Sequence, residues 1–507
     1  MNNKKELYKF FKDINQNKIT AKELQTLKIA FSKENKLKGI PLTSDILAAL
    51  KIKRPSKTLI TKPHRTESGV TVIAVMTRPE ACPGKCIYCP SYKDAPKSYT
   101  GFEPAAMRGK LNFYDPKKQI RDRLKQLEAT GHPTNKLEVI IMGGTFPATD
   151  IKYQKEFVRG IYQEITGSKE EDISKLQKIA MKSKRRMVGL TFETRPDFCN
   201  EKEIRRMLEF GGTRVEIGVQ TVYDDIFKKI KRGHGIKEVI EATRKLKDSG
   251  LKVLYHMMIG LPGSNIKKDQ EAFKEIFRNQ AYCPDMIKIY PCLVTKYTKL
   301  EKMYYSGEYK IYDDEKLIKL IADIKEIVPS WVRIMRIQRD IPATKIIAGA
   351  KKSNLRELVK KELMIRGTKC DCIRCKEPEG KIININKYEI KKVRYNASDG
   401  DELFISAETN NHLLGFIRLR FPKKPFIKEI DKKTSIVREL HVYGEATNFD
   451  DKNIQHRGIG KKLLKIAEDI SKDNKFEKIA VISGVGVREY YKKQGYKLIG
   501  TYMIREL

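Results

Sequence analysis

The sequence predicts an α/β protein in which a partial parallel barrel is followed by a smaller mixed α/β unit. Three observations support this class. Apolar runs alternate with charged helical segments from Thr71 to Gln338, a cysteine-containing connector follows, and a glycine-rich loop precedes a helical pattern near the C-terminus. Such alternation is typical of a parallel sheet with helices outside it. The length of 507 residues accommodates roughly two to four domains.

The charge balance favours a polyanionic partner. The chain has 103 Lys and Arg against 64 Asp and Glu, a formal net charge of +39, while its hydrophobic content of 40% is enough for folded cores. RNA or DNA is the natural partner for such a surplus. The alternative is that a lysine-rich source organism accounts for part of it.

Residues 1–63 are expected to form a small basic helical module. They contain 15 Lys and Arg against 5 Asp and Glu, and apolar residues such as Leu7, Phe10, Phe11 and Ile14 recur at helical spacing. We expect this module to bind tRNA. The alternative is a solvated helical cap on the next domain.

Residues 64–345 are expected to form the barrel. Six apolar runs are predicted strands: 70–76, 137–142, 187–192, 214–219, 252–259 and 286–289. In parallel barrels, active-site residues gather where the strands end. Five features would therefore share one rim: the cysteine loop 82–89, the pair Gly143 and Gly144, Glu193, Gln220 and Lys288.

Three cysteines with C-x3-C-x2-C spacing, Cys82, Cys86 and Cys89, follow the first predicted strand. Three thiolates can hold three irons of a [4Fe–4S] cluster and leave the fourth iron open for S-adenosylmethionine. This spacing is the signature of radical S-adenosylmethionine enzymes, and Gly143-Gly144-Thr145 after the next predicted strand strengthens it. The alternatives are a zinc knuckle or coincidence.

Residues 346–380 are expected to form a connector with a second triplet, Cys370, Cys372 and Cys375. Its C-x-C-x2-C spacing can place three thiolates around one ion, and we expect Zn²⁺, with His64 as the candidate fourth ligand. A second iron–sulfur cluster is the alternative. Clustered cysteines indicate metal ligands in a reducing compartment rather than disulfides.

The sequence contains no apolar run of membrane-spanning length and no signal core at its N-terminus, so a cytoplasmic protein without membrane contact is expected.

Residues 381–507 contain a loop typical of acetyl-coenzyme A binding. The run Gln455-His456-Arg457-Gly458-Ile459-Gly460 follows a strand-like segment and opens a helical pattern. Unpaired backbone N–H groups at a helix N-terminus bind phosphates. Acetyltransferases of the GNAT type hold the coenzyme A pyrophosphate in this way. A helix, a glycine, an aromatic and a last strand near 497–503 complete the GNAT pattern.

Together the motifs resemble the catalytic subunit of Elongator, the tRNA wobble-uridine modifying enzyme, from near residue 60 to the C-terminus. The resemblance also rests on the segments 98–104, 193–197, 289–291, 339–342 and 438–444. The short gap between Cys82 and Cys86 resembles archaeal or bacterial forms, which act without the other Elongator subunits. A homodimer is left open.

The resemblance implies roles for particular residues. Gly143, Gly144, Thr145, Glu193 and Gln220 would contact S-adenosylmethionine or substrate, Lys288 would be catalytic, and Tyr490 and Tyr491 would orient the thioester. A buried ion pair is the alternative for Glu193 and Arg195, and a core position is expected for at least one of the tyrosines. Glu439 and His441 are weak candidates for a base. His234 and His256 could touch the site, but a lone histidine is more often a hydrogen-bonded core residue, so the expectation for both is a core position.

The main functional expectation is a synthase of 5-carboxymethyluridine at the anticodon wobble position. A 5′-deoxyadenosyl radical would abstract hydrogen from the acetyl methyl group of acetyl-coenzyme A. The resulting carbon radical would add to C5 of the uridine, and the thioester would then be hydrolysed. A methyl group of this kind has no usefully acidic proton, so homolysis is the accessible route. The alternatives are a protein lysine acetyltransferase and an RNA-binding scaffold with vestigial sites.

Overall fold

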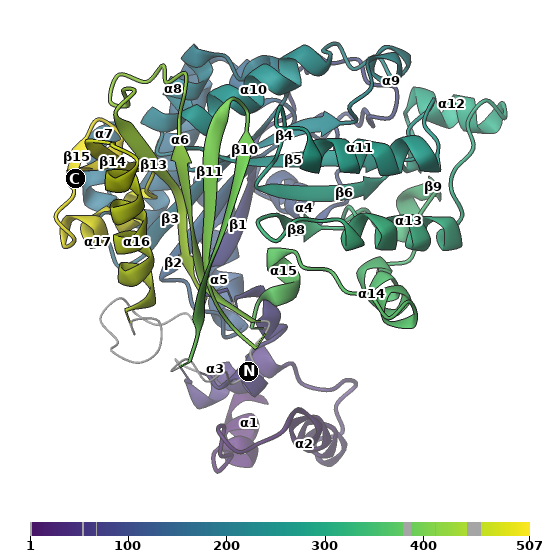
Figure 1. The fold of residues 1–507 in the computed structure, drawn as a ribbon. Helices are drawn as coiled ribbons and strands as arrows, with labels where there is room; N and C mark the ends of the chain where they lie inside the picture. The colour runs from purple at the N-terminus through teal and green to yellow at the C-terminus, as the bar shows by residue number, and fades with distance from the viewer. Residues whose placement is uncertain (1–2, 53–54, 67, 379–386, 411, 444–457) are drawn as a thin grey trace.

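The computed structural model describes residues 3–52, 55–66, 68–378, 387–410, 412–443 and 458–507. Two large sheets organise it (Figure 1). The first contains seven parallel strands in the order β1-β2-β3-β4-β5-β6-β8. The order follows the chain, so each helix between strands crosses over to the next parallel strand, as expected for an open barrel. In the described part of the chain, no helix is long and apolar enough to cross a membrane.

The strands of the first sheet lie close to the predicted runs, with one addition. They are β1 (Thr71–Met76), β2 (Lys136–Met142), β3 (Arg186–Thr194), β4 (Arg214–Gln220), β5 (Lys252–Ile259), β6 (Met286–Pro291) and β8 (Arg333–Arg336). The seventh strand, β8, was not predicted. Its sequence Arg-Ile-Met-Arg is only four residues long and ends in charges, so it gives no apolar run.

Helices cover the outside of this sheet, as α10, α11 and α13 show in Figure 1. Several begin at a side chain that caps the free N–H groups of the first turn; Asp150, for example, accepts from Lys152 and Tyr153. The helices of this region are α4 (Pro104–Leu111), α5 (Pro116–Ala129), α6 (Ile151–Thr166), α7 (Ile173–Ala180), α8 (Glu201–Glu209), α9 (Asp224–Lys229), α10 (Ile236–Asp248), α11 (Ile266–Arg278), α12 (Lys299–Tyr305), α13 (Asp314–Glu326), α14 (Leu355–Ile365) and α15 (Ile373–Lys376). The strands β7 (Val294–Thr295) and β9 (Ile346–Ala348) form a small ribbon beside them.

The second sheet has the order β10-β11-β12-β13-β14-β16-β15 and is mixed, because β13 and β14 run parallel while the other pairs are antiparallel. Its strands are β10 (Glu389–Ala397), β11 (Gly400–Thr409), β12 (His412–Phe421), β13 (Thr434–Val442), β14 (Lys478–Val481), β15 (Lys497–Ile499) and β16 (Tyr502–Glu506). The single last strand predicted over 497–503 is wrong. Gly500, with φ +56°, instead turns the chain into a hairpin of β15 and β16.

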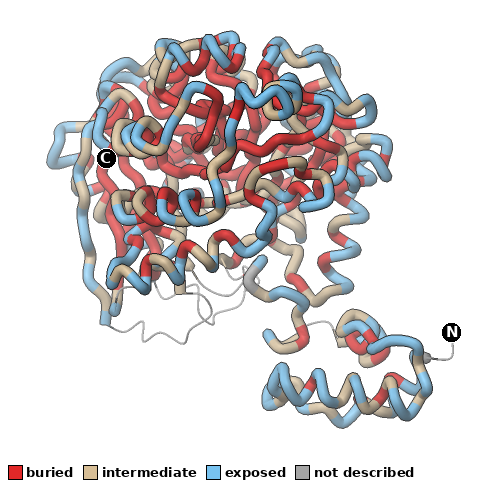
Figure 2. Tube along the Cα trace, turned by 90° about the vertical axis from the view of Figure 1, so that its right-hand side faces the viewer, coloured by how far each residue is buried: buried red, intermediate tan, exposed pale blue. Residues whose placement is uncertain are grey.

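One face of the second sheet packs on helix α16 (Ile459–Asp473), and the other joins the core of the barrel. Ile436, Ile482 and Tyr502 belong to the same apolar cluster as the barrel strands. Figure 2 shows this buried interior as continuous. The barrel and the second sheet are therefore packed as one body.

The N-terminal module consists of α1 (Asn3–Phe11), α2 (Ala21–Glu34) and α3 (Thr43–Leu50). It has its own small apolar core, including Leu7, Phe11, Phe31 and Ile46. In Figures 1 and 2 it projects from one end of the molecule. The prediction of a small helical module is confirmed.

Candidate active site

The first cysteine triplet lies in the loop that leaves the C-terminal end of β1, at the predicted rim. Cys86 is 7% exposed, and a hydrogen bond from the Cys89 thiol, together with the charge of Arg232, lowers the pKa of Cys86 to about 5. The Sγ atom of Cys82 lies 3.7 Å from Thr145 Oγ1 and accepts a hydrogen bond from the Gly84 amide. Of the three thiols, Cys86 is thus the one whose surroundings favour the thiolate, whereas its hydrogen bond with Cys86 and burial raise the pKa of Cys89.

Two arginines enclose this loop. Arg232 donates to Cys86 Sγ at 3.4 Å and to His234 Nε2 at 2.9 Å. A Cβ atom on Gly84 would lie 2.0 Å from Arg195 Nη1, so that guanidinium rests directly on the loop backbone. Arg195 Nη1 is buried without a hydrogen-bond partner among the described residues. This set of three cysteines between two cations fits an anionic iron–sulfur cluster.

His234 has a role that the sequence did not predict, since the expectation was an ordinary core histidine. Burial and the charge of Arg232 lower the pKa of His234 to about 4, so its ring is neutral and can accept the Arg232 hydrogen bond. His234 therefore orients the cation that touches Cys86.

The glycine pair after β2 lies beside the cysteine loop. Gly143 has φ +125° and Gly144 has φ +68°, which are conformations that favour glycine. A Cβ atom on Gly143 would lie 2.2 Å from Thr77 Oγ1, whereas the nearest atom to a Cβ on Gly144 would be 4.0 Å away. Gly144 therefore presents backbone to open space, as close approach by a ligand requires.

A charged cluster extends across the neighbouring strands β3 to β6. Lys288 lies 3.5 Å from Glu193 and makes a shorter contact with Glu216, and His256 bonds Glu216 at 2.9 Å. The Tyr99 hydroxyl donates to Glu193 at 2.6 Å. The strand register explains the convergence, because Glu193 lies opposite Glu216 and His256 opposite Lys288.

The pKa values of this cluster follow from burial and charge. Burial opposes the charged form of Lys288, but Glu216 outweighs it and raises the Lys288 pKa above its usual value. Burial, followed by the Lys288 charge, lowers the pKa of His256, so the ring is neutral. His256, which was expected to be an ordinary core histidine, is thus part of the site. Gln220 ends β4 nearby with φ +74°, an uncommon conformation for a residue with a side chain.

The second cysteine triplet is tightly drawn together. The sulfur atoms of Cys370, Cys372 and Cys375 all lie within 4.8 Å of one another, and Lys325 donates to Cys375 at 3.4 Å. Hydrogen bonds from the other two thiols and the Lys325 charge lower the pKa of Cys375. Three thiols at this separation fit a single ion. The side chain of His64, the predicted fourth ligand, lies outside the described part of the chain.

The acetyl-coenzyme A motif lies at the N-terminus of α16. Gly458 caps this helix with φ +84°, and Ile459 and Gly460 form its first turn. The strands β13 and β14 pair only over Thr434–Val437 of β13, after which β13 continues to Val442 paired with β12 alone. The part of β13 beyond Val437 and the N-terminus of α16 border an opening that we call the wedge. Gln455, His456 and Arg457 lie outside the described residues.

Of the two predicted tyrosines, Tyr490 faces this wedge. A Cβ atom on Gly460 would meet Tyr490 Oη at 3.4 Å, whereas Tyr491 is 5% exposed and packs on Tyr490 and Tyr496. Tyr491 therefore occupies the core position expected for at least one of the pair. Glu439 is half-buried and accepts a hydrogen bond from Arg418 at 2.9 Å, and burial lowers the pKa of His441.

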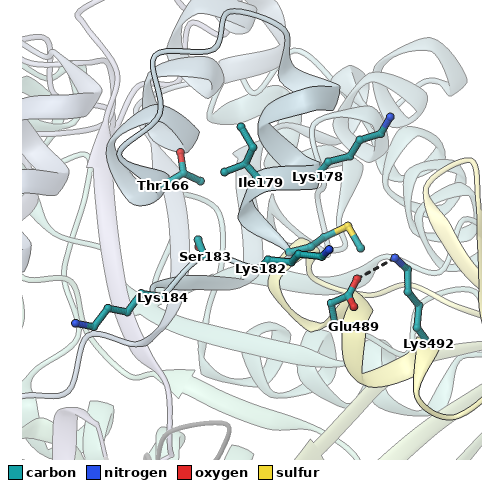
Figure 3. A pocket seen from close by; sticks show the side chains of 9 residues that line it. Thr166, Lys178, Ile179, Lys182, Ser183, Lys184, Glu489 and Lys492 are labelled. Carbon is teal, nitrogen blue, oxygen red and sulfur yellow. Dashed lines mark hydrogen bonds and ion pairs between the residues drawn. The ribbon is translucent and has the colours of Figure 1, made fainter.

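A recess of about 620 Å³ lies on the other side of α17 (Arg488–Lys492), between that helix and the end of α7. Figure 3 shows its lysines together with the Glu489–Lys492 ion pair of 2.8 Å. The lining residues are Thr166, Lys178, Ile179, Met181, Lys182, Ser183, Lys184, Glu489 and Lys492. None of the predicted site residues lines it.

Comparison with known families agrees with this geometry. Residues 76–276 match the Radical SAM superfamily, residues 284–364 the Radical_SAM C-terminal domain, and residues 374–496 the Acetyltransferase (GNAT) family. The chain is 51% identical over 465 residues to a tRNA uridine(34) acetyltransferase of Methanocaldococcus infernus, covering 88% of this chain and 87% of the relative. It is 40% identical over 523 residues to human Elongator complex protein 3, covering 98% and 94% of the two chains.

A solved structure gives the same result. Archaeal Elp3 from Methanocaldococcus infernus with an N-terminal deletion (1–46) superposes with a TM-score of 0.78 at 46% identity. The match covers 87% of this chain and 99% of that one. The chain belongs to the family of tRNA uridine(34) acetyltransferases and Elongator complex protein 3.

Proposed function

We propose that this protein modifies the wobble uridine of tRNA, forming 5-carboxymethyluridine from acetyl-coenzyme A by radical chemistry. The observation that carries the proposal is that one packed body contains the loop with Cys82, Cys86 and Cys89, a charged cluster on the same sheet, and the wedge at the N-terminus of α16. Relatives named for acetyl transfer to uridine 34 supply the substrate class.

Cys82, Cys86 and Cys89 would hold a [4Fe–4S] cluster, and Arg232 and Arg195 would balance its negative charge. Bound there with S-adenosylmethionine, such a cluster supplies a 5′-deoxyadenosyl radical by reductive cleavage. The backbone of Gly143 and Gly144, with Thr145, would receive the methionyl end of the cofactor.

The cluster of Lys288, Glu193, Glu216, His256 and Tyr99 would orient the uracil ring. Its carboxylates and Lys288 are buried, and electrostatic interactions strengthen when water is excluded. A carbonyl oxygen of uracil could accept from Lys288 or Tyr99. A position fixed in this way keeps C5 of the base at the reacting carbon.

The GNAT wedge would hold acetyl-coenzyme A. Free N–H groups of the first turn of α16 would bind the pyrophosphate, and the Tyr490 hydroxyl would point at the thioester. We also assign Zn²⁺ to Cys370, Cys372 and Cys375, because three thiols within 4.8 Å match the size of one ion rather than of a cluster. We further propose that the protein acts without other Elongator subunits.

The decisive test is anaerobic reconstitution of the protein with iron, sulfide, S-adenosylmethionine, dithionite, tRNA and acetyl-coenzyme A deuterated in its methyl group. Deuterium is expected in 5′-deoxyadenosine, and labelled carboxymethyluridine in the tRNA digest, both measured by mass spectrometry. If acetyl-lysine forms on protein and no deuterium reaches deoxyadenosine, the protein is a lysine acetyltransferase instead. The ion pair of the half-buried Glu439 with the buried Arg418 makes this carboxylate a poor general base for that reaction.

A further inference from the structure

A strap of chain, residues 91–103, crosses the open side of the barrel above the cysteine loop. It begins two residues after Cys89, which follows the edge strand β1, and it contacts Arg339, which follows the opposite edge strand β8. Arg339 donates to the carbonyl of Ser98 and lies 3.9 Å from Glu103. Glu103 in turn accepts from the amides of Thr100 and Gly101. These bonds fix the strap in place.

The strap has two different faces. Tyr99 points inward and donates to Glu193 in the charged cluster. Tyr92 and Phe102 meet on its other face, with ring centroids 6.1 Å apart at 85°. A third ring, Tyr297, lies 4.9 Å from Tyr92 at 88°. We call Tyr92, Phe102 and Tyr297 the outer aromatic cluster.

The outer aromatic cluster is open to solvent. Tyr297 is 64% exposed and Phe102 is 36% exposed. Tyr297 also has φ +63°, which is unusual for an aromatic residue, and its amide donates to Glu301 at 2.9 Å. The backbone therefore holds the ring outward at a cost in strain, and strain of this kind concentrates at functional sites.

Cations surround these rings. Lys345 Nζ lies 4.0 Å from the centroid of Phe102. Lys93, Lys296 and Lys299 are exposed, and none of them forms an ion pair with a described residue. Exposed aromatic rings beside unpaired lysines are the combination that binds single-stranded nucleic acid: the rings stack on bases and the lysines contact phosphates.

We propose that the outer aromatic cluster is a stacking site for unpaired bases of an RNA loop, next to the base that enters the barrel. This inference rests on the proposed function for the identity of the RNA. The charge around the rings and the net charge of +39 favour RNA over an apolar protein surface. If one base stacks on the outer aromatic cluster, the next base along the RNA would lie within reach of the barrel opening beside the strap.

The test compares two RNA probes with the full-length protein, without cofactors, by fluorescence anisotropy. One probe is a hairpin with a seven-nucleotide single-stranded loop, and the other is a blunt duplex with the same number of phosphates. Tyr297→Ala and Phe102→Ala are each expected to weaken hairpin binding by about tenfold, which corresponds to about 1.4 kcal/mol for one lost stacking contact. Duplex binding should not change.

Matched variants make the result specific. Tyr297→Phe and Phe102→Tyr keep a ring and should bind the hairpin like the wild type. Tyr305→Ala removes a 70% exposed tyrosine from the far end of α12, and it should also have no effect. Circular dichroism melting confirms that each variant is folded. The inference is overturned if the alanine variants bind the hairpin normally, or if they lose hairpin and duplex binding equally.

The two proposals can fail separately. If carboxymethyluridine forms but the alanine variants bind and modify tRNA as the wild type does, only the stacking site is wrong. If the rings are required for hairpin binding but no modified uridine forms, the stacking site stands and the proposed function falls.

Discussion

Lys288 shows how a single residue determines the charge state of its neighbours. It lies between Glu193 and Glu216, and together with burial, which is the larger cause, its charge lowers the pKa of His256 although that ring bonds a carboxylate. The sequence could predict that Lys288 and Glu193 share a rim, because both lie toward the ends of predicted strands. It could not predict Glu216, His256 or Tyr99 as partners, since their convergence depends on strand register and on the path of the strap.

Replacing Lys288 should therefore change the titration of His256. In Lys288→Met, the carboxylates of Glu193 and Glu216 would face the ring with Arg214, 3.3 Å from Glu216, as the remaining ion-pair partner, and the pKa of His256 should rise above its unfolded value of about 6.5. A raised native pKa adds stability below the unfolded pKa, and this stability is lost as the pH rises through the native pKa. The variant should lose about 3–5 kcal/mol at pH 8 and less at pH 5.5, as measured by urea unfolding. The double variant with His256→Gln should lose most of this pH dependence, and a flat pH profile in the single variant would contradict the argument.

The first cysteine triplet gives a second prediction at this scale. Cys82→Ala, Cys86→Ala and Cys89→Ala should each greatly reduce the visible iron–sulfur absorbance after anaerobic reconstitution, and they should abolish deoxyadenosine formation. Cys199 is 3% exposed and lies after β3 outside this loop, so Cys199→Ala is the control and should keep the absorbance. RNA binding should survive in all four variants. Full absorbance in a triple variant would exclude these residues as ligands.

At the scale of elements, the apolar runs predicted six barrel strands because a buried parallel strand is apolar on both faces. The seventh, β8, gave no such signal, since Arg333 and Arg336 are half-buried charged residues in a strand of four.

The turn near Gly486 shows a different limit of prediction from the sequence. The sequence does not show what the glycines of this turn pack against, whereas in the structure a Cβ atom on Gly484 would lie 2.0 Å from the Val188 carbonyl oxygen. These glycines allow the second sheet to pack against β3.

Gly484→Ala should consequently destabilise the protein. Gly484 has φ −55°, so the backbone can accept alanine, and the clash with the rigid backbone of Val188 is the only cost. Overpacking of this kind costs about 1–3 kcal/mol, measurable as the free energy of unfolding in urea. Gly39→Ala is the matched control, because nothing lies within 4 Å of its added Cβ. Equal stability of the two variants would show that the interface yields easily.

Replacing Gly460 by alanine should have opposite effects on the stability of α16 and on the affinity for acetyl-coenzyme A. Its added Cβ would meet Tyr490 Oη at 3.4 Å and Val442 Cγ2 at 3.5 Å, which are ordinary contacts. Gly460→Ala should stabilise α16 by about 0.5–1 kcal/mol. Because the methyl group would occupy the wedge, the affinity for acetyl-coenzyme A should fall about tenfold, as measured by isothermal titration calorimetry. Unchanged affinity would place the ligand elsewhere.

At the scale of the molecule, a buried charge network joins the barrel to the second sheet. Arg438 of β13 contacts Asp285, which precedes β6, and lies 3.0 Å from Glu402 of β11; Lys247 of α10 lies 3.4 Å from both carboxylates. All four side chains are fully buried, so removal of one partner would leave an uncompensated charge. The sequence could not reveal this network, because its members lie far apart along the chain. The two catalytic units should therefore unfold together.

The N-terminal module, unlike the second sheet, does not share the core of the barrel, so it can be deleted without disturbing the rest of the fold. Its apolar core is separate from that of the barrel, and the solved archaeal relative with residues 1–46 deleted keeps the shared fold. Removal of residues 1–60 should thus leave the thermal unfolding of the remainder nearly unchanged. It also removes most of the local excess of 15 basic over 5 acidic residues in 1–63. Because released counterions drive phosphate contacts, tRNA affinity should fall by roughly an order of magnitude or more, and the slope of log affinity against log salt should become shallower. Anisotropy measured between low and moderate salt tests both effects.

A matched variant that keeps the module but replaces Lys28, Lys33, Lys36 and Lys38 by Gln separates the effect of charge from the effect of shape. This variant should reproduce much of the loss in tRNA affinity. If the truncated protein binds tRNA with the same affinity and the same salt slope, residues 1–63 are a cap, and the stacking site and the rest of the basic surface hold the RNA without them.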